Sequence, residues 1–178
     1  MDMVVHVYTL GHSNRDLKEF INIIQDYSIQ ILFDVRRFPS SRFSPHFSYD
    51  NLLKTLRKLS IDYVWIKELG GFRKFGEDVE DIGIGKSIKS EGFRAYATYL
   101  AINNGAKQAL VKLASIAEQK TTVIMCRERF PWRCHRRFIS DYLFSRGFQV
   151  IHILELGREI KHKLPRYACL HDGEVVYL

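Results

Sequence analysis

Residues 126–138, CRERFPWRCHRRF, combine side chains that bind anions with side chains that can react. This segment contains five arginines, two cysteines and one histidine. Arginine offers planar donors that match phosphate or carboxylate, and a positive field lowers the pKa of a nearby cysteine and favours its thiolate. The segment is therefore interpreted either as an anion-binding loop around a reactive Cys126 or as a solvated basic loop flanked by a core cysteine.

The second half of this segment opens a predicted helix at Cys134. A helix N-terminus presents free N–H groups and the positive end of the helix dipole, so it attracts anions. Arg133 and Arg136 flank this start, and His135 lies within it. We expect these residues to belong to an anion-binding site.

The spacing of the two cysteines disfavours two known uses of cysteine. In single-cysteine phosphatases an arginine stands six residues after the cysteine, but here Trp132 occupies that position and the loop lacks glycines. Cys126, Cys134 and His135 could ligate a metal, yet C-x7-C-H is not a standard zinc pattern, and joint binding by adjacent Cys134 and His135 is awkward. The sequence therefore predicts no metal and no cofactor, although a metal- or redox-sensing protein stays open as an alternative.

Polar residues also follow the first three predicted strands. His12 and Ser13 come directly after the first strand, and Glu68 follows the third. Asp34 and Arg36 alternate at the end of the second strand, so their side chains share one face. His12 is interpreted either as a general acid/base or as a histidine bonded to Asp34 or to backbone. Asp34 either forms a structural ion pair with Arg36 or orients a catalytic histidine.

The elements that must position these residues are predicted from apolar periodicity. Strands are expected over residues 4–10, 29–35, 61–67, 121–126 and 148–154, with a last short strand in the tail GEVVYL. Helices are expected over residues 14–27, 49–59, 91–118 (two helices that break near 103–105) and 134–146. We expect Ser13 to cap the first helix, with Asp16 three residues later. Alternation of strands and helices predicts one α/β domain over 1–178, with a mostly parallel sheet of about five strands and helices on both faces.

Two loops are candidates for ligand contact. Residues 72–90 are rich in glycine and charge, and they predict a flexible loop or insertion that serves as a lid or stays disordered. Residues 36–47, RRFPSSRFSPHF, interleave basic and aromatic residues, a pattern that can stack bases and hold phosphates. We expect Arg42 to contact a partner, and Phe38 and Phe47 to cover the sheet edge.

Composition narrows the class of partner. Lys and Arg number 27 against 20 Asp and Glu, for a net charge of +7, which favours an anionic ligand such as a nucleotide or nucleic acid. Three cysteines do not make a disulfide framework, so a reducing, cytoplasmic location is expected. No run approaches the roughly 20 apolar residues that span a bilayer, so no membrane partner is expected.

Taken together, the motifs resemble the domain of unknown function 488 family. The blocks that carry the resemblance are GHS at 11–13, DVRRFPSS at 34–41, ELGG at 68–71 and CRERFPWRCHRR at 126–137. The resemblance implies a compact α/β fold and no settled activity. The family signature falls on Gly11, His12, Ser13, Asp34, Arg36, Pro39, Ser41, Pro45, Phe47, Glu68, Gly70, Gly71, Cys126, Cys134, His135, Arg136 and His162.

We therefore predict an enzyme that acts on a phosphate-bearing substrate, a nucleotide or nucleic acid, at the carboxyl edge of the sheet. The predicted catalytic residues are His12, Asp34, Cys126 and His135. The predicted substrate-binding residues are Ser13, Arg36, Arg42, Glu68, Arg133 and Arg136. The alternatives are a non-catalytic nucleic-acid-binding module and the metal- or redox-sensing protein.

Overall fold

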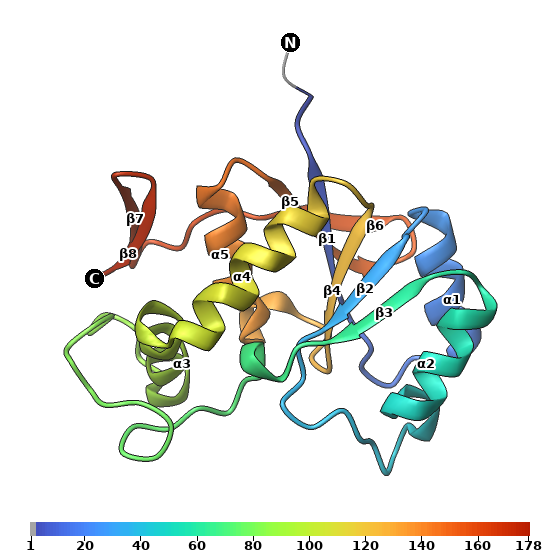
Figure 1. The fold of residues 1–178 in the computed structure, drawn as a ribbon, viewed down its shortest axis with the longest axis horizontal. Helices are drawn as coiled ribbons and strands as arrows, with labels where there is room; N and C mark the ends of the chain where they lie inside the picture. The colour runs from blue at the N-terminus through green and yellow to red at the C-terminus, as the bar shows by residue number, and fades with distance from the viewer. Residues whose placement is uncertain (1–2) are drawn as a thin grey trace.

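Six strands form the central sheet, in the order β3-β2-β4-β1-β5-β6, in the computed structural model, which describes residues 3–178 (Figure 1). The strands are β1 His6–Gly11, β2 Ile31–Asp34, β3 Asp62–Trp65, β4 Thr122–Cys126, β5 Gln149–Glu155 and β6 Arg158–Lys161. The first five are parallel, and β6 pairs antiparallel with β5. The prediction of a mostly parallel α/β sheet is confirmed. The sixth strand was missed because all four of its residues are exposed, so it carries no apolar pattern.

A separate two-stranded hairpin forms the C-terminal tail, with β7 Ala168–His171 and β8 Glu174–Tyr177. The predicted strand in the tail is confirmed as β8. Asp172 and Gly173 form the turn, and both have positive φ, +50° and +77°. This is the backbone that a two-residue hairpin turn needs, and Asp-Gly is a favoured pair for it.

Five helices connect the strands: α1 Leu17–Asp26, α2 Tyr49–Lys58, α3 Glu91–Ile102, α4 Asn104–Ala117 and α5 Arg136–Ser145. The predicted break between α3 and α4 is confirmed at Asn103, whose side chain accepts a hydrogen bond from the Ala106 N–H at 2.9 Å and so caps α4. The expected cap of α1 is wrong. Asp16, not Ser13, accepts the hydrogen bond from the backbone N–H of Glu19.

The helices cover both faces of the sheet, as expected (Figure 1). Ile31 and Phe33 of β2 point to the face that α3, α4 and α5 cover, whereas Leu32 between them points to the face that α1 and α2 cover. This alternation explains why the strands are apolar on both sides. Two hydrophobic cores result, one on each side of the sheet.

The neighbouring strands β1 and β4 lead to helices on opposite faces of the sheet. Gly11, the last residue of β1, lies beside Cys126, the last residue of β4. After β1 the chain turns to α1 on one face, and after β4 it turns to α5 on the other. The chain therefore switches from one face of the sheet to the other at this carboxyl edge, and such switch points are where open α/β sheets bind ligands.

Residues 70–90 contain no helix and no strand beyond one isolated bridge between Phe75 and Val79. Asp78 ties this segment to the domain, because its carboxylate pairs with Arg37 at 2.8 Å and with Arg73 at 3.3 Å. These contacts hold the segment beside the loop that follows β2.

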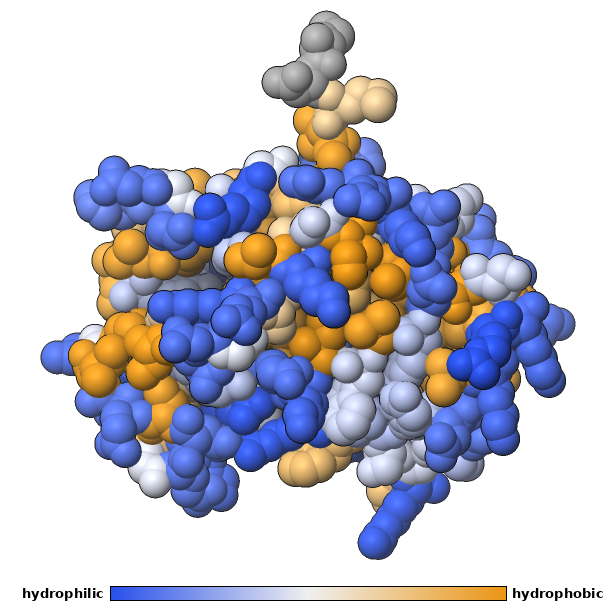
Figure 2. Space-filling model, viewed as in Figure 1, coloured by the Kyte–Doolittle hydropathy of each residue, from blue (hydrophilic) through white to orange (hydrophobic). Residues whose placement is uncertain are grey.

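The surface is mostly polar in the view of Figure 2, with an apolar patch near the centre between α4 and β3. Within residues 3–178, no helix has both the length and the apolar character needed to cross a membrane.

Candidate functional site

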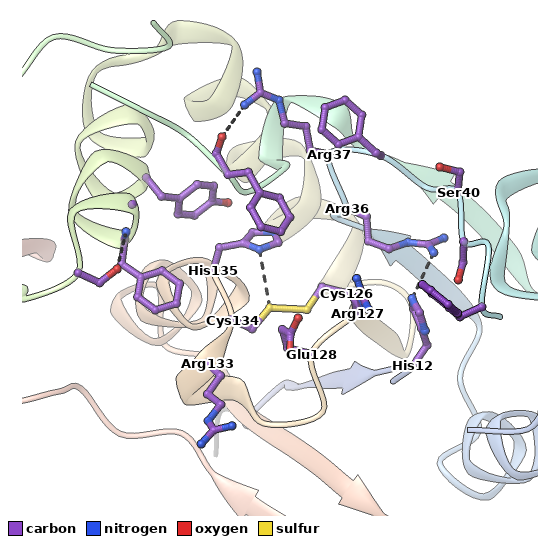
Figure 3. A pocket seen from close by; sticks show the side chains of 18 of the residues that line it. His12, Arg36, Arg37, Ser40, Cys126, Arg127, Glu128, Arg133, Cys134 and His135 are labelled. Atoms are coloured by element: carbon purple, nitrogen blue, oxygen red, sulfur yellow. Dashed lines mark hydrogen bonds between the residues drawn. A yellow bond between two sulfur atoms is a disulfide. The ribbon is translucent and has the colours of Figure 1, made fainter. Parts of the chain in front are cut away.

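A cavity of about 520 Å³ lies at the carboxyl edge of the sheet, where β1, β2 and β4 end (Figure 3). Six of the predicted site residues line it: His12, Arg36, Arg42, Cys126, Arg133 and His135. The other four predicted residues, Ser13, Asp34, Glu68 and Arg136, are not among its lining residues. The cavity therefore brings together side chains from the ends of three strands, β1, β2 and β4, and from the loops that follow them.

Arg36 forms part of the cavity wall and is held from behind by Asp34. The Arg36 Nε donates to Asp34 Oδ1 at 2.9 Å, and its Nη2 donates to Oδ2 at 2.6 Å. The Tyr63 hydroxyl donates to the same carboxylate at 2.5 Å, and burial together with this negative charge raises the pKa of Tyr63. Asp34 has no hydrogen bond to His12 or His135 in the part of the chain that the structure describes. Its role here is to fix Arg36, as the structural ion-pair interpretation expected.

His12 is a neutral base with a defined tautomer. Arg36 Nη1 lies 3.3 Å from His12 Nε2, and because a guanidinium only donates, Nε2 must accept. The proton therefore sits on Nδ1, which donates to the carbonyl of Ser13 at 2.9 Å. Burial, together with the nearby Arg36, lowers the pKa of His12 to about 4. The ring is held in place by stacking on Phe47, at 4.5 Å between centroids.

The two cysteines of the signature segment meet at the floor of the cavity. Cys126 ends β4 and Cys134 precedes α5, and their sulfurs are joined in a disulfide (Figure 3). His135 Nδ1 lies 3.7 Å from the Cys134 sulfur, and its Nε2 lies 2.7 Å from the carbonyl of Val35. That carbonyl can only accept, so His135 carries its proton on Nε2 and turns a lone pair toward the sulfurs.

Position 71 requires glycine, because the His135 ring fills the space where a side chain would lie. A Cβ on Gly71 would lie 2.6 Å from His135 Nδ1. Gly70 is constrained in the same way, because its Cβ would lie 2.6 Å from the Cα of Arg37. The ELGG block therefore lets the chain after β3 pack closely against the site.

Arg136 is completely buried and lies beneath the cavity. Its guanidinium donates to Cys126 Sγ at 2.8 Å, to Thr9 Oγ1 at 3.2 Å, and to the carbonyls of Glu128 and Arg129 at 2.5 and 3.0 Å. Burial lowers its pKa to about 9, so it stays a cation at neutral pH. We expected Arg136 to clamp a ligand anion. Instead it binds the loop after β4 from the inside.

Two further predicted binding residues also have local roles. Ser13 has a positive φ of +49°, and its hydroxyl donates to the neighbouring Asn14 side chain at 3.3 Å. The backbone carbonyl of Glu68 accepts from the Tyr99 hydroxyl at 2.8 Å. Neither side chain reaches the cavity wall.

The sequence interpretation missed the aromatic part of the cavity wall. Phe38, Phe43, Phe72, Phe93 and Tyr96 all line the cavity. Phe38 was expected to cover the sheet edge, but it is 67% exposed, whereas Phe47 is buried as expected. Phe72 follows the ELGG block and has a positive φ of +56°, which is strained for a bulky residue and is typical of functional sites. In the sequence, the position of Phe72 directly after the two glycines could have indicated that it lines the cavity. No sequence pattern indicated this for Phe93 of α3.

The mouth of the cavity carries positive charge without a matching set of acids. Within residues 3–178, Arg42, Arg127 and Arg133 form no salt bridge, and Glu128 is the only carboxylate among the lining residues. These arginines are exposed and are among the residues that line the cavity. The opening therefore has an excess of positive charge.

A second buried polar network extends from Arg136 along the α5 face of the sheet toward β5 and β6. Arg136 donates to Thr9, whose hydroxyl lies 2.7 Å from His152 Nδ1. His152 Nε2 lies 2.9 Å from His162 Nδ1, and His162 Nε2 lies 2.8 Å from Asp141. With the cation at one end and the carboxylate at the other, every hydrogen bond of the network can point the same way, from Arg136 toward Asp141.

Acid should unfold the protein partly through His152. Burial, followed by the nearby His162 and Arg136, lowers the pKa of His152 to about 3, whereas its unfolded value is near 6.5. The unfolded state then binds one more proton below pH 6.5, so this stability is present above pH 6.5 and is lost as the pH falls toward 3. In urea titrations between pH 6 and 4, His152→Gln should reduce the slope of unfolding free energy against pH by about 1.4 kcal/mol per pH unit.

The control for this prediction is His171→Gln. His171 is exposed in the C-terminal hairpin, so its replacement removes an imidazole that folding does not bury, and His152→Gln should change the slope more than His171→Gln does. Equal slopes for wild type and His152→Gln would show that His152 is not held neutral.

The fold and the cavity define a doubly wound α/β protein with a cationic, cysteine-containing cavity at its topological switch point. A family model described as "Domain of unknown function DUF488" matches residues 16–143, more than half of the chain, and the chain belongs to this family. The comparisons with curated proteins and with solved structures each found no match.

Proposed function

We propose that the protein is an enzyme that acts on a phosphate-bearing substrate with a planar ring, such as a nucleotide or a nucleic acid, bound in this cavity. The observation that carries the proposal is the combination of three arginines without salt bridges and a largely aromatic wall around one cavity. At about 520 Å³ the cavity falls within the range of roughly 300–1,000 Å³ that small-molecule sites occupy.

The arginines favour an anion at the cavity mouth. Arg42 comes from the loop after β2, Arg127 and Arg133 come from the loop after β4, and all three line one cavity. Guanidinium groups bind phosphate oxygens through paired N–H donors, and an arginine that is not already paired with an acid keeps those donors free. Deeper in the cavity, Arg36 is fixed by Asp34 and can bind the same anion.

The aromatic residues favour a planar ring beside that anion. Phe43 and Phe72 are 93% and 79% exposed and line the same cavity, and exposed apolar side chains that gather at a cavity are typical of ligand sites. Bases stack on exposed aromatic rings, and each stacked base contributes about 1–3 kcal/mol. An anion with an attached base therefore matches both parts of the wall.

His12 is the general base in this proposal. Its Nε2 lone pair accepts from Arg36 Nη1 at 3.3 Å. A substrate anion that takes over the Nη1 donor would release this lone pair, which could then accept a proton from the substrate or from water. Substrate binding and activation of the base are thus coupled through Arg36.

The second candidate is a non-catalytic module that binds single-stranded nucleic acid. The exposure of Phe38, Phe43 and Phe72 around the cavity mouth favours it, because a strand needs several stacking platforms in a row. Both candidates predict salt-sensitive binding. They differ in turnover: an enzyme converts its substrate and needs His12 to do so, whereas a binding module converts nothing.

The test measures binding of nucleotides and of short single strands at several salt concentrations. The double variant Arg42→Ala/Arg133→Ala should bind at least tenfold more weakly, and its dependence of log affinity on log salt should fall by about one unit per arginine. The matched control is Lys107→Ala/Lys112→Ala, which removes two exposed charges from α4. Equal losses in the two double variants would refute binding in the cavity.

His12→Gln then separates the enzyme from the binding module. Retained binding with loss of turnover supports the enzyme. Retained binding without any turnover in the wild-type protein, across phosphomonoester and phosphodiester substrates, supports the binding module.

We also propose that the protein works in the cytoplasm. The one disulfide, Cys126–Cys134, lines the cavity and Cys169 is free, so the three cysteines form no stabilising framework, which supports a reducing compartment. Cell fractionation with thiol trapping tests this, and recovery of the protein outside the cytoplasmic fraction would contradict it.

A further inference from the structure

We propose that Cys126, Cys134 and His135, when the two cysteines are reduced, bind a thiophilic divalent cation such as Zn²⁺, with one coordination position open to the cavity. This inference goes beyond the proposed function, because it concerns a metal site that could exist whichever ligand the cavity accepts. It rests on the positions of three donor atoms, on the fixed tautomer of His135 and on the surroundings of the two sulfurs.

The donor atoms have the spacing of a metal site. The two sulfurs and a ring nitrogen of His135 all lie within 4.8 Å of one another. Zn–S bonds of about 2.3 Å and Zn–N bonds of about 2.0–2.1 Å place S and N about 3.5 Å apart in a tetrahedron. The observed separation of Cys134 Sγ and His135 Nδ1 is 3.7 Å.

The backbone positions of the two cysteines suit a shared ion. Their Cα atoms are 7.6 Å apart, whereas disulfide-bonded cysteines usually have Cα atoms about 4.4–6.8 Å apart. Two thiolates around one tetrahedral ion lie about 3.8 Å apart, so they need a wider backbone separation than a disulfide does. The carboxyl end of β4, at Cys126, and the turn before α5, at Cys134, provide that separation.

His135 is prepared as a ligand by its second hydrogen bond. Metal-bound histidines almost always donate their other ring N–H to a carbonyl or carboxylate, which fixes the tautomer and the ring orientation. The Nε2 of His135 lies 2.7 Å from the Val35 carbonyl, and this leaves Nδ1 unprotonated beside the sulfurs. Gly71 keeps that side of the ring free, because a Cβ there would lie 2.6 Å from Nδ1.

Cys134 and His135 are adjacent, and joint binding of one ion by two adjacent residues is awkward in an extended chain. A change of backbone conformation at the start of α5 removes this difficulty. Cys134 is extended, with φ −133° and ψ 145°, whereas His135 is helical, with φ −62° and ψ −21°. The bend between them brings the two side chains to the same side of the loop (Figure 3). The C-x7-C-H spacing therefore reflects a site built across a strand end and a helix start.

The surroundings of the two sulfurs are positively charged, so they favour a divalent ion whose charge is neutralised by two thiolates. Two thiolates neutralise a divalent ion, and the sulfurs can then accept hydrogen bonds from nearby donors. Arg136 Nη1 lies 2.8 Å from Cys126 Sγ, and the Arg136 backbone N–H lies 3.5 Å from Cys134 Sγ. Such outer contacts orient and tune metal ligands.

Metal binding requires opening of the disulfide. A thiol reductant supplies two electrons and two protons, the S–S bond breaks to give two thiols, and the reductant is oxidised to its own disulfide. Binding of the cation then releases both thiol protons and leaves two thiolates on the ion. All three ligand residues line the cavity, so the remaining position faces its interior, as in zinc sites that bind water or substrate.

The test is a titration of the reduced, chelator-treated full-length protein with Co²⁺, which replaces Zn²⁺ and reports thiolate ligation through its absorption. We expect one equivalent of Co²⁺ with a thiolate-to-cobalt charge-transfer band, displaced by one equivalent of Zn²⁺. Absence of the band from fully reduced wild-type protein would overturn the proposal. This readout does not depend on whether any variant folds.

Matched variants locate the site. Cys134→Ser and His135→Asn should each weaken Zn²⁺ binding at least 100-fold, while Cys169→Ser, which changes the exposed free cysteine of the hairpin, should leave it unchanged. Circular dichroism checks that the variants fold. Loss of binding in Cys169→Ser to the same extent would overturn the assignment. Nucleotide binding is measured in metal-free protein, so failure of either proposal leaves the other testable.

Discussion

Replacement of Arg136 by methionine should lower the free energy of unfolding by about 3–5 kcal/mol. The side chain is completely buried, and its guanidinium is the donor for Cys126, Thr9 and two backbone carbonyls of the loop after β4. Methionine fills much of the same volume but supplies no N–H group. The acceptors would stay buried without partners, and the network that ends at Asp141 would lose its cation.

The measurement is urea denaturation of wild type and variant under reducing conditions. Arg133→Met is the matched control, because Arg133 is exposed and forms no salt bridge within the described residues. Its effect on stability should stay within about 0.5 kcal/mol. Similar stabilities for the two variants would mean that Arg136 is not the internal support of the loop.

Replacement of Gly11 by alanine should destabilise the protein by about 3 kcal/mol or more and should displace the loop that carries Cys126 and Arg127. An added Cβ would lie 1.9 Å from the carbonyl oxygen of Glu128 and 2.4 Å from its carbon. Both are backbone atoms, and Arg136 holds that carbonyl in place. The contact therefore cannot be relieved by rotation of a side chain.

Gly92→Ala provides the control for this substitution. Gly92 lies in the first turn of α3, and a Cβ there meets no atom within 4 Å. Alanine is favoured over glycine in helices, so this variant should be neutral or up to about 1 kcal/mol more stable. Thermal unfolding of the two variants makes the comparison, and a Gly11→Ala protein as stable as wild type would show that the loop is free to move.

The sheet and its two helical layers could be predicted from the sequence because burial on both sides leaves a clear pattern. Ile31, Leu32 and Phe33 are apolar in succession, and each is buried against one of the two cores. The edge strand β6 left no such pattern, because its residues face solvent and only pairing with β5 makes them a strand.

The location of the cavity could also be predicted, because parallel strands bring their carboxyl ends to one edge. His12, Arg36 and Cys126 follow three different strands and line one cavity. The aromatic wall could not be predicted in the same way. Phe72 and Phe93 reach the cavity only through the packing of residues 70–90 and of α3 on the rest of the domain.

The tertiary structure decides which arginines line the cavity and which are buried beneath it. The sequence alone predicts a basic segment that leads from a strand to a helix, and within it Arg133 and Arg136 are equivalent by composition. Packing of α5 against the sheet turns Arg136 inward to Cys126 and Thr9, while Arg133, in the short turn before the helix, stays at the cavity mouth. The sequence predicts the layers and the sheet edge where the cavity lies, because periodicity and strand ends are local properties. The separation of supporting from exposed arginines requires the folded structure, because it depends on which side of each element its neighbours cover.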